Sequence, residues 1–66
     1  MKIIYNGNEQ DVSEGITLAE LIRNLELNPE TVVAECNGAI VRPDEYETYV
    51  LPEKGRLELI RFVGGG

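Results

Sequence analysis

The residues of this chain best suited to chemistry are the last three, Gly64, Gly65 and Gly66. Glycine has no Cβ, so a diglycine end can enter a narrow channel and another protein can approach its main chain closely. Three extended residues reach roughly 10 Å, because each spans about 3.3 to 3.6 Å. The pattern predicts a flexible tail that brings the carboxylate of Gly66 into a partner's active site. The alternative is a frayed end without function, since chain termini are commonly disordered.

Size and charge exclude several classes of function. The 66 residues make one small domain, and a domain of this length buries only about 60 % of its unfolded surface, so a deep catalytic cleft is not expected. Twelve acidic against six basic residues leave a net charge of −6, which repels nucleic acid backbones and anionic lipids. Neither is an expected partner. A basic surface on another protein fits better, although the acid excess also serves solubility.

The remaining reactive side chains do not indicate a catalytic or metal site. Cys36 is the only cysteine and the chain has no histidine, so neither an internal disulfide nor a cysteine–histidine metal site is expected. We interpret Cys36 as a small packed strand residue rather than a reactive thiol. The carboxylates between Pro43 and Tyr49 are interpreted as a solvated loop or single helical turn. The apolar stretch at the N-terminus is too short for a signal peptide or membrane span, so the expected location is the cytoplasm.

Local patterns predict a sheet with two tight hairpins. Asn6-Gly7 and Asn37-Gly38 are dipeptides that accept positive φ at both central positions of a two-residue turn. Runs of β-branched and aromatic residues flank both turns. The expected strands cover residues 2–5, about 9–13, 31–37, 39–41 and 56–62, and residues 49–51 are expected to pair briefly with the sheet.

One helix is predicted to begin at Thr17. Thr17 and Glu20 match the capping box, in which each side chain satisfies a free backbone N–H of the first turn. Asn28-Pro29 must lie beyond the helix, because proline disfavours helical geometry in the preceding residue. About three turns are therefore expected. The spacing of the apolar residues predicts a buried stripe made of Leu18, Leu21, Ile22 and Leu25.

The last predicted strand carries apolar residues on both faces. Leu57 and Leu59 point to one side of the sheet, while Ile60 and Phe62 point to the other. If the single helix covers one face only, the second face stays near solvent beside the tail. We therefore predict a partner-docking patch of Ile60, Phe62 and Val63. The alternative is a central strand whose second face is covered by a loop.

This order of elements resembles the ubiquitin-like β-grasp fold. The chain is similar throughout its length to the bacterial sulfur carriers of that fold, most of all to the ThiS family of thiamin biosynthesis, which is related to the molybdopterin synthase small subunit. The resemblance implies an α+β domain at residues 1–63, with a mixed four- to five-stranded sheet packed on one helix, and a flexible tail at 64–66. The segments that carry it are 1–7, 17–22, 33–38, 40–41 and 57–66.

The resemblance also implies a mechanism in which the carrier is a cosubstrate and not an enzyme. A ThiF-like adenylyltransferase, using ATP and magnesium, would adenylylate the Gly66 carboxylate, and sulfur from a cysteine desulfurase would convert it to a thiocarboxylate. A ThiG-like thiazole synthase would then take the sulfur. Gly64 and Gly65 would serve tail recognition, although the family pattern requires only the last two glycines. The carrier itself would bind no cofactor or metal and would be a monomer.

Two alternatives remain at this point. The first keeps the tail chemistry and changes the recipient to molybdopterin, tRNA thiolation or cysteine synthesis. The second is a ubiquitin-like module for protein binding or conjugation.

Overall fold

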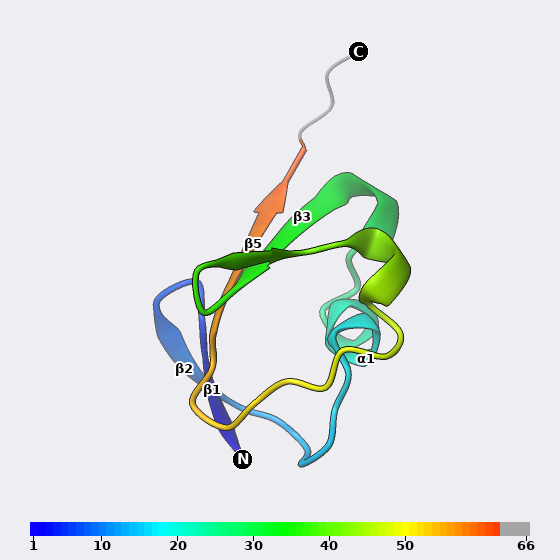
Figure 1. The fold of residues 1–66 in the computed structure, drawn as a ribbon. Helices are drawn as coiled ribbons and strands as arrows, with labels where there is room; N and C mark the ends of the chain where they lie inside the picture. The colour runs from blue at the N-terminus through cyan, green and yellow to red at the C-terminus, as the bar shows by residue number, and fades with distance from the viewer. Residues whose placement is uncertain (63–66) are drawn as a thin grey trace.

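A computed structural model describes residues 1–62 of the chain, which form one mixed five-stranded sheet and one α-helix (Figure 1). The strand order is β2-β1-β5-β3-β4. The pair β1 and β5 is parallel, and the other neighbouring pairs are antiparallel. The elements are β1 Lys2–Tyr5, β2 Asn8–Asp11, α1 Leu18–Asn24, the 3-10 turn η1 Pro29–Thr31, β3 Val32–Cys36, β4 Ala39–Val41, the 3-10 turn η2 Pro43–Glu45 and β5 Arg56–Arg61. The predicted β-grasp architecture is confirmed.

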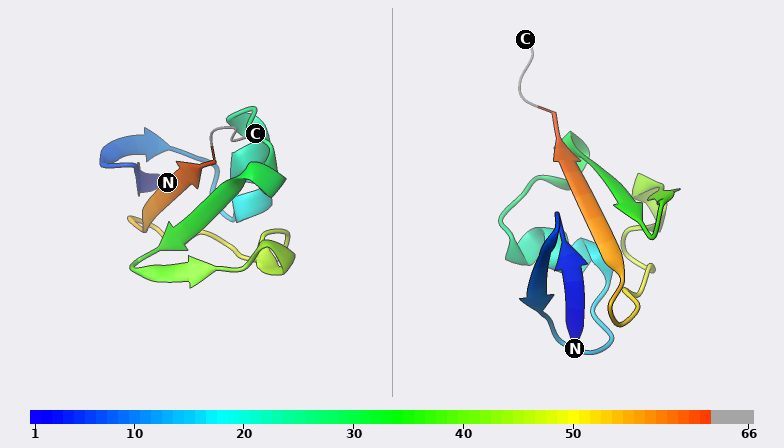
Figure 2. Two further views of the ribbon diagram at one scale, coloured as in Figure 1. Left: turned by 90° about the horizontal axis from the view of Figure 1, so that it is seen from above. Right: turned by 90° about the vertical axis from the view of Figure 1, so that its left-hand side faces the viewer.

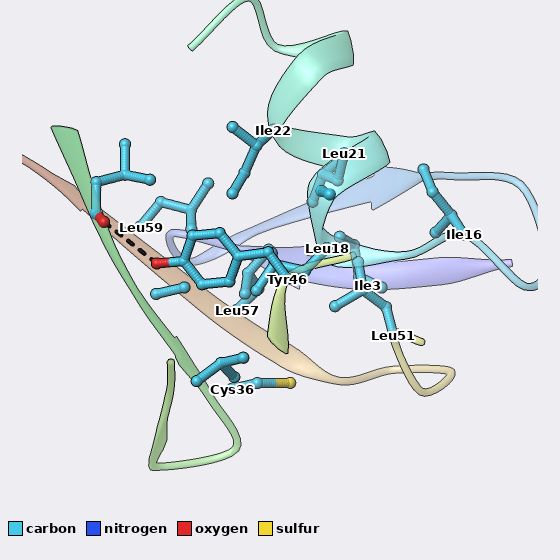
Figure 3. Close-up of a cluster of buried hydrophobic side chains, with 14 residues drawn as sticks. Ile3, Ile16, Leu18, Leu21, Ile22, Cys36, Tyr46, Leu51, Leu57 and Leu59 are labelled. Carbon is cyan, nitrogen blue, oxygen red and sulfur yellow. Dashed lines mark hydrogen bonds between the residues drawn. The ribbon is translucent and has the colours of Figure 1, made fainter. Parts of the chain in front are cut away.

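The helix α1 lies across one face of the sheet, as the views in Figure 2 show. The core fills the space between them, and Figure 3 shows side chains from both layers meeting there. Cys36 is one of these residues and is 2 % exposed, as expected for a packed strand residue. The buried set is Ile3, Ile16, Leu18, Ala19, Leu21, Ile22, Val32, Ala34, Cys36, Val41, Tyr46, Leu51, Leu57 and Leu59. No helix within residues 1–62 is long and apolar enough to cross a membrane.

Both predicted Asn-Gly turns are present, and both asparagine side chains also bind β5. Asn6 and Asn37 have φ of 46° and 52°, values that asparagine tolerates better than most residues. The Asn6 amide receives the N–H of Leu59 at 2.8 Å and donates to the carbonyl of the same residue at 3.3 Å. The Asn37 side-chain oxygen accepts the N–H of Arg56 at 2.9 Å. The turns therefore hold the last strand from both of its edges.

The capping box of α1 is confirmed. The N–H of Glu20 donates to the Thr17 hydroxyl at 3.2 Å, and the N–H of Thr17 donates to the Glu20 carboxylate at 2.9 Å. This second bond lowers the pKa of the Glu20 carboxyl group, because it favours the charged form.

The helix is shorter than the expected three turns, since it has only 7 residues. It ends at Asn24, and the C-cap residue Leu25 is half-buried, not buried as predicted. Glu26 takes the left-handed conformation with φ of 59°. Its N–H donates to the carbonyl of Arg23 at 2.9 Å, and the N–H of Leu27 donates to that of Ile22 at 3.1 Å. These two bonds form a Schellman motif. The left-handed residue of a Schellman motif is usually glycine, but here it is glutamate. The motif was therefore not predicted from the sequence.

Two further expectations need correction, and a third agrees with the structure. The strand β2 ends at Asp11 instead of about residue 13. Beyond it, the N–H of Val12 donates to the Met1 carbonyl at 2.8 Å, and the N-terminal amino group of Met1 donates to the Val12 carbonyl at 3.1 Å. Residues 49–51 do not join the sheet but pair with residues 16–18, through an antiparallel bridge between Thr17 and Val50. The acidic segment contains the 3-10 turn η2, consistent with the expected single helical turn.

Tyr46, at the end of this acidic segment, is a core residue. The ring is 3 % exposed, and the hydroxyl donates to the carbonyl of Val32 at 3.2 Å, the dashed line in Figure 3. Burial raises the pKa of the Tyr46 phenol. The sequence did not indicate that Tyr46 is buried, because its neighbours are charged. A short turn can point one side chain inward while the others stay in solvent.

The asparagine contacts to β5 give a paired test. Asn6→Asp removes the NH₂ donor and places an oxygen beside the Leu59 carbonyl, so we expect a loss of about 1 to 2 kcal/mol in the free energy of unfolding. Asn37→Asp adds the same charge but keeps the acceptor that Arg56 uses, and should cost less than about 0.5 kcal/mol. Urea unfolding measures both. Equal losses would show that the Asn6 donor does not stabilise β5.

Candidate functional site

The end of β5 presents two different faces to its surroundings. Leu57 and Leu59 point into the core and are 1 % and 6 % exposed, whereas Ile60 is 58 % and Phe62 is 65 % exposed. The predicted contrast between two buried leucines and two exposed apolar residues is confirmed, although Phe62 borders a groove that α1 also lines. No loop among residues 1–62 buries Ile60 or Phe62, so the alternative of a covered second face does not hold for these two side chains.

We call the side of the sheet opposite α1 the outer face. On this face Ile60 lies directly opposite Val33 of β3, and Glu58 lies opposite Glu35. On the other side of β3, Glu35 lies opposite Ile40 of β4, which is 68 % exposed. The sequence analysis did not single out Ile40. The exposure of Ile40 could have been predicted from the alternation of side chains in residues 39–41. Val41 points inward, so the residue before it points outward.

Phe62 lies one residue beyond β5, where its N–H donates to the carbonyl of Thr31 at 2.8 Å. This bond continues the pairing of the last strand with the segment that leads into β3. The Phe62 side chain borders an apolar groove of about 410 Å³ between α1, η1 and η2. An ion pair between Arg23 and Glu47, 3.2 Å long, lies at its rim. The other lining residues include Ala19, Pro29, Val32, Pro43 and Tyr46.

The residues predicted to carry the tail chemistry lie beyond this point. Val63, Gly64, Gly65 and Gly66 are outside the described residues, so the flexible tail and the roles given to these four positions stay predictions. What the structure provides is their starting point, since Phe62 is tied to the sheet by its backbone. Within the described part of the chain, no three histidine, cysteine, aspartate or glutamate side chains are grouped so that they could hold a metal ion.

Comparison with known proteins identifies the family. The ThiS family model matches residues 3–66, almost the whole chain and all of its glycine end. The chain belongs to the ThiS family. The resemblance to this family of sulfur carriers, drawn from the sequence, is therefore confirmed.

Solved structures agree with this assignment. The crystal structure of the thiamine biosynthesis protein ThiS from Geobacter metallireducens superposes with a TM-score of 0.85, with 26 % identity and complete coverage of both chains. An NMR structure of a thiamine biosynthesis protein from the same organism gives a TM-score of 0.81, also at 26 % identity, and covers 88 % of that chain.

Two curated relatives are much longer proteins. A thiazole synthase of Magnetococcus marinus is 39 % identical over 66 residues, and one of Paramagnetospirillum magneticum is 32 % identical over the same length. The match takes in the whole of this chain but only 20 % of either relative. A third relative, the uncharacterized protein ycf40 of Pyropia yezoensis, is 32 % identical and is covered to 93 %.

The two faces of β5 predict different costs for the same truncation. Leu59→Ala removes a buried side chain and should lower the free energy of unfolding by about 2 to 5 kcal/mol. Ile60→Ala, one residue later on the exposed face, should cost less than about 1 kcal/mol. Chemical denaturation of the two variants measures the difference. A large loss for Ile60→Ala would mean that the outer face contributes to the stability of the fold.

Proposed function

We propose that this chain is a cytoplasmic sulfur carrier for the thiazole of thiamine, loaded and unloaded at the carboxylate of Gly66. The observation that carries the proposal is the ThiS family match, which extends through the final glycine. The relatives named thiazole synthase support this recipient over molybdopterin, tRNA or cysteine, because in those proteins the region similar to this chain belongs to the same polypeptide as a much larger part. A ThiG-like thiazole synthase is thus the proposed recipient of the sulfur.

Loading begins with activation of the tail. A terminal carboxylate has a pKa of roughly 3.3 to 3.7, so it is ionised in the cell and is a poor electrophile. In the active site of a ThiF-like adenylyltransferase with ATP and magnesium, a Gly66 carboxylate oxygen would attack the α-phosphate and release pyrophosphate. The product is an acyl-adenylate, whose AMP is a good leaving group.

Sulfur then replaces AMP. A persulfide that originates from a cysteine desulfurase attacks the acyl carbon and AMP departs, which leaves an acyl disulfide. A thiol reductant cleaves the S–S bond and gives the thiocarboxylate of Gly66. Its sulfur is a nucleophile that thiazole synthase can use. When the bond between the acyl carbon and sulfur breaks, an oxygen atom from water or from the sulfur acceptor takes the place of the sulfur, which returns the carrier to its carboxylate form.

In these steps the partner enzymes would bind the folded domain, and the domain itself would not catalyse the reactions. Ile60 and Phe62 lie at the start of the tail and are exposed, so a partner that holds this patch, together with Val63, also sets where the glycines enter. Extended chain spans about 3.3 to 3.6 Å per residue. The four residues after Phe62 therefore reach roughly 13 Å from the patch, and Gly64 and Gly65 allow this path to be narrow.

Mass spectrometry tests the tail chemistry. Incubation of the chain with a ThiF-like adenylyltransferase, ATP, magnesium, a desulfurase, cysteine and a thiol reductant should raise the intact mass by the difference between oxygen and sulfur. Deletion of Gly65 and Gly66 should abolish this change. It should leave the unfolding midpoint unaltered, because the core residues lie between Ile3 and Leu59. A wild-type chain that stays unmodified under these conditions would refute the proposed function.

The docking patch is tested by charge insertion. Ile60→Asp and Phe62→Asp place a charge where an apolar contact is proposed, and each should weaken binding to the adenylyltransferase about tenfold or more. Val50→Asp is the matched control, since Val50 is 56 % exposed and belongs to the segment paired with Thr17. Titration calorimetry measures the affinities. Equal effects of all three changes would show that the patch has no special role.

A further inference from the structure

A single backbone hydrogen bond marks where the sheet ends within residues 1–62. The N–H of Phe62 donates to the carbonyl of Thr31 at 2.8 Å, one step beyond the last pair of the β3–β5 ladder, Val32 with Arg61. The length of chain beyond the sheet is therefore counted from Phe62. If this bond opens, that segment gains one residue, which is about 3.3 to 3.6 Å of extended chain.

The acceptor of this bond belongs to the turn η1, which lies near the surface. Pro29 and Glu30 are exposed, and Thr31 is half-buried. A three-residue turn of this kind gains little from the burial of apolar area, so local hydrogen bonds must hold its shape. The position of the Thr31 carbonyl thus depends on the residue that closes the turn.

Asn28 closes η1 with three hydrogen bonds. Its side-chain oxygen accepts the N–H of Glu30 at 2.9 Å. Its backbone carbonyl accepts the N–H of Thr31 at 2.9 Å and the Thr31 hydroxyl at 2.8 Å. Asparagine is among the preferred N-cap residues, because its side chain satisfies a free backbone donor of the first turn. Together these bonds fix the peptide units that lead to the Thr31 carbonyl.

The turn also meets the Phe62 side chain. Pro29 and Glu30 line the same apolar groove that Phe62 borders. A looser η1 would therefore release Phe62 in two ways, through its backbone bond and through its groove. Leu59, three residues earlier, would stay in place, because it is buried in the core and its N–H is bonded to the Asn6 side chain at 2.8 Å.

We propose that Asn28 is a positioning residue for the tail. By closing η1 it keeps the Thr31 carbonyl on the Phe62 N–H, and this sets the length of chain between the docking patch and Gly66. The inference rests on the proposed function, because it names a residue that prepares the carrier for loading. An enzyme that binds the patch then has one backbone residue fewer to immobilise, and immobilising a residue costs conformational entropy.

The test combines enzyme kinetics with amide hydrogen exchange of the full chain. Asn28→Ala removes the cap, and the apparent affinity falls with the fraction of chains in which Phe62 stays bonded. The KM of the adenylyltransferase for the carrier, measured by pyrophosphate release, should rise about twofold to threefold, with kcat unchanged because the glycines are intact. In NMR spectra the Phe62 amide should exchange about threefold faster, while the Leu59 amide keeps its rate.

A second variant enlarges the effect, and a conservative one reverses it. Asn28→Ala/Thr31→Ala removes both side-chain bonds of the turn but keeps the Thr31 carbonyl, so KM should rise further, to about fivefold. Asn28→Ser keeps an acceptor oxygen at the N-cap and adds no charge. It should restore the wild-type KM and the wild-type exchange rate of Phe62. A serine variant that behaves like Asn28→Ala would contradict the role given to the cap.

Thr17→Ala is the matched control, because it removes the other side-chain N-cap of the fold at a comparable cost in stability. Thr17 caps α1 and bridges to Val50, which lies outside β5. The unfolding midpoint should therefore fall, while KM changes less than about 1.5-fold. Equal increases in KM for Thr17→Ala and Asn28→Ala would overturn the inference, since only overall stability would then matter.

The remaining outcomes separate this inference from the proposed function. If the wild-type chain is adenylylated and Asn28→Ala keeps its KM, the inference fails while the proposed function stands. If the Phe62 amide exchanges no faster in Asn28→Ala, the cap does not hold the bond to Thr31 and the inference fails as well. If the wild-type chain is not adenylylated at all, both fail together.

Discussion

The structure depends on how its last strand is held. β5 lies between β1 and β3, and its parallel pairing with β1 covers only two residue pairs. The N–H of Ile4 donates to the carbonyl of Gly55, just before β5, at 2.9 Å, and the N–H of Asn6 donates to the carbonyl of Leu57 in β5 at 2.8 Å. The side chains of Asn6 and Asn37 then bond to the β5 backbone from both edges. A strand fixed in this way gives the residues after Phe62 a defined point of departure.

Small size explains why one side of this sheet is free to bind. A single two-turn helix with its adjoining loops covers one face, and all the core side chains gather there. The elements of residues 1–62 include no second layer over the opposite face. Exposed isoleucines on that face are therefore a consequence of the architecture, and a partner can use them. The inner face supports folding and the outer face remains available for recognition.

The same division explains how a very small protein can take part in demanding chemistry. The proposed reactions need ATP, magnesium, a persulfide and a nucleotide leaving group, none of which the domain has to bind by itself. The domain has to be recognised, and it has to present a backbone end narrow enough to enter other active sites. Under the proposed function, the exposed side chains of Ile60 and Phe62 beside a glycine end meet both needs with few residues.

Much of the fold could be predicted because its signals are local. The Asn-Gly turns need positive φ, the Thr17–Glu20 capping box satisfies backbone donors within one turn, and the alternation in β5 assigns each side chain to a face. The family resemblance added the architecture and the proposed function. These features depend on residues within a few positions of one another, so the order of the amino acids is enough to specify them.

Other features required the tertiary structure because they join residues far apart in the chain. The buried Tyr46 hydroxyl donates a hydrogen bond to a carbonyl 14 residues away. The Asn6 side chain bonds to the backbone of a strand residue 53 positions away. The pairing of Glu35 with Glu58 in one ladder and with Ile40 in the other follows from strand order and register. The sequence by itself determined both Asn-Gly turns, the start of the helix, most of the strands and which leucines of β5 are buried, but not where the helix ends or how residues 49–51 pair. Only the tertiary structure decided which outward side chains are neighbours, because that depends on the register in which distant strands pair.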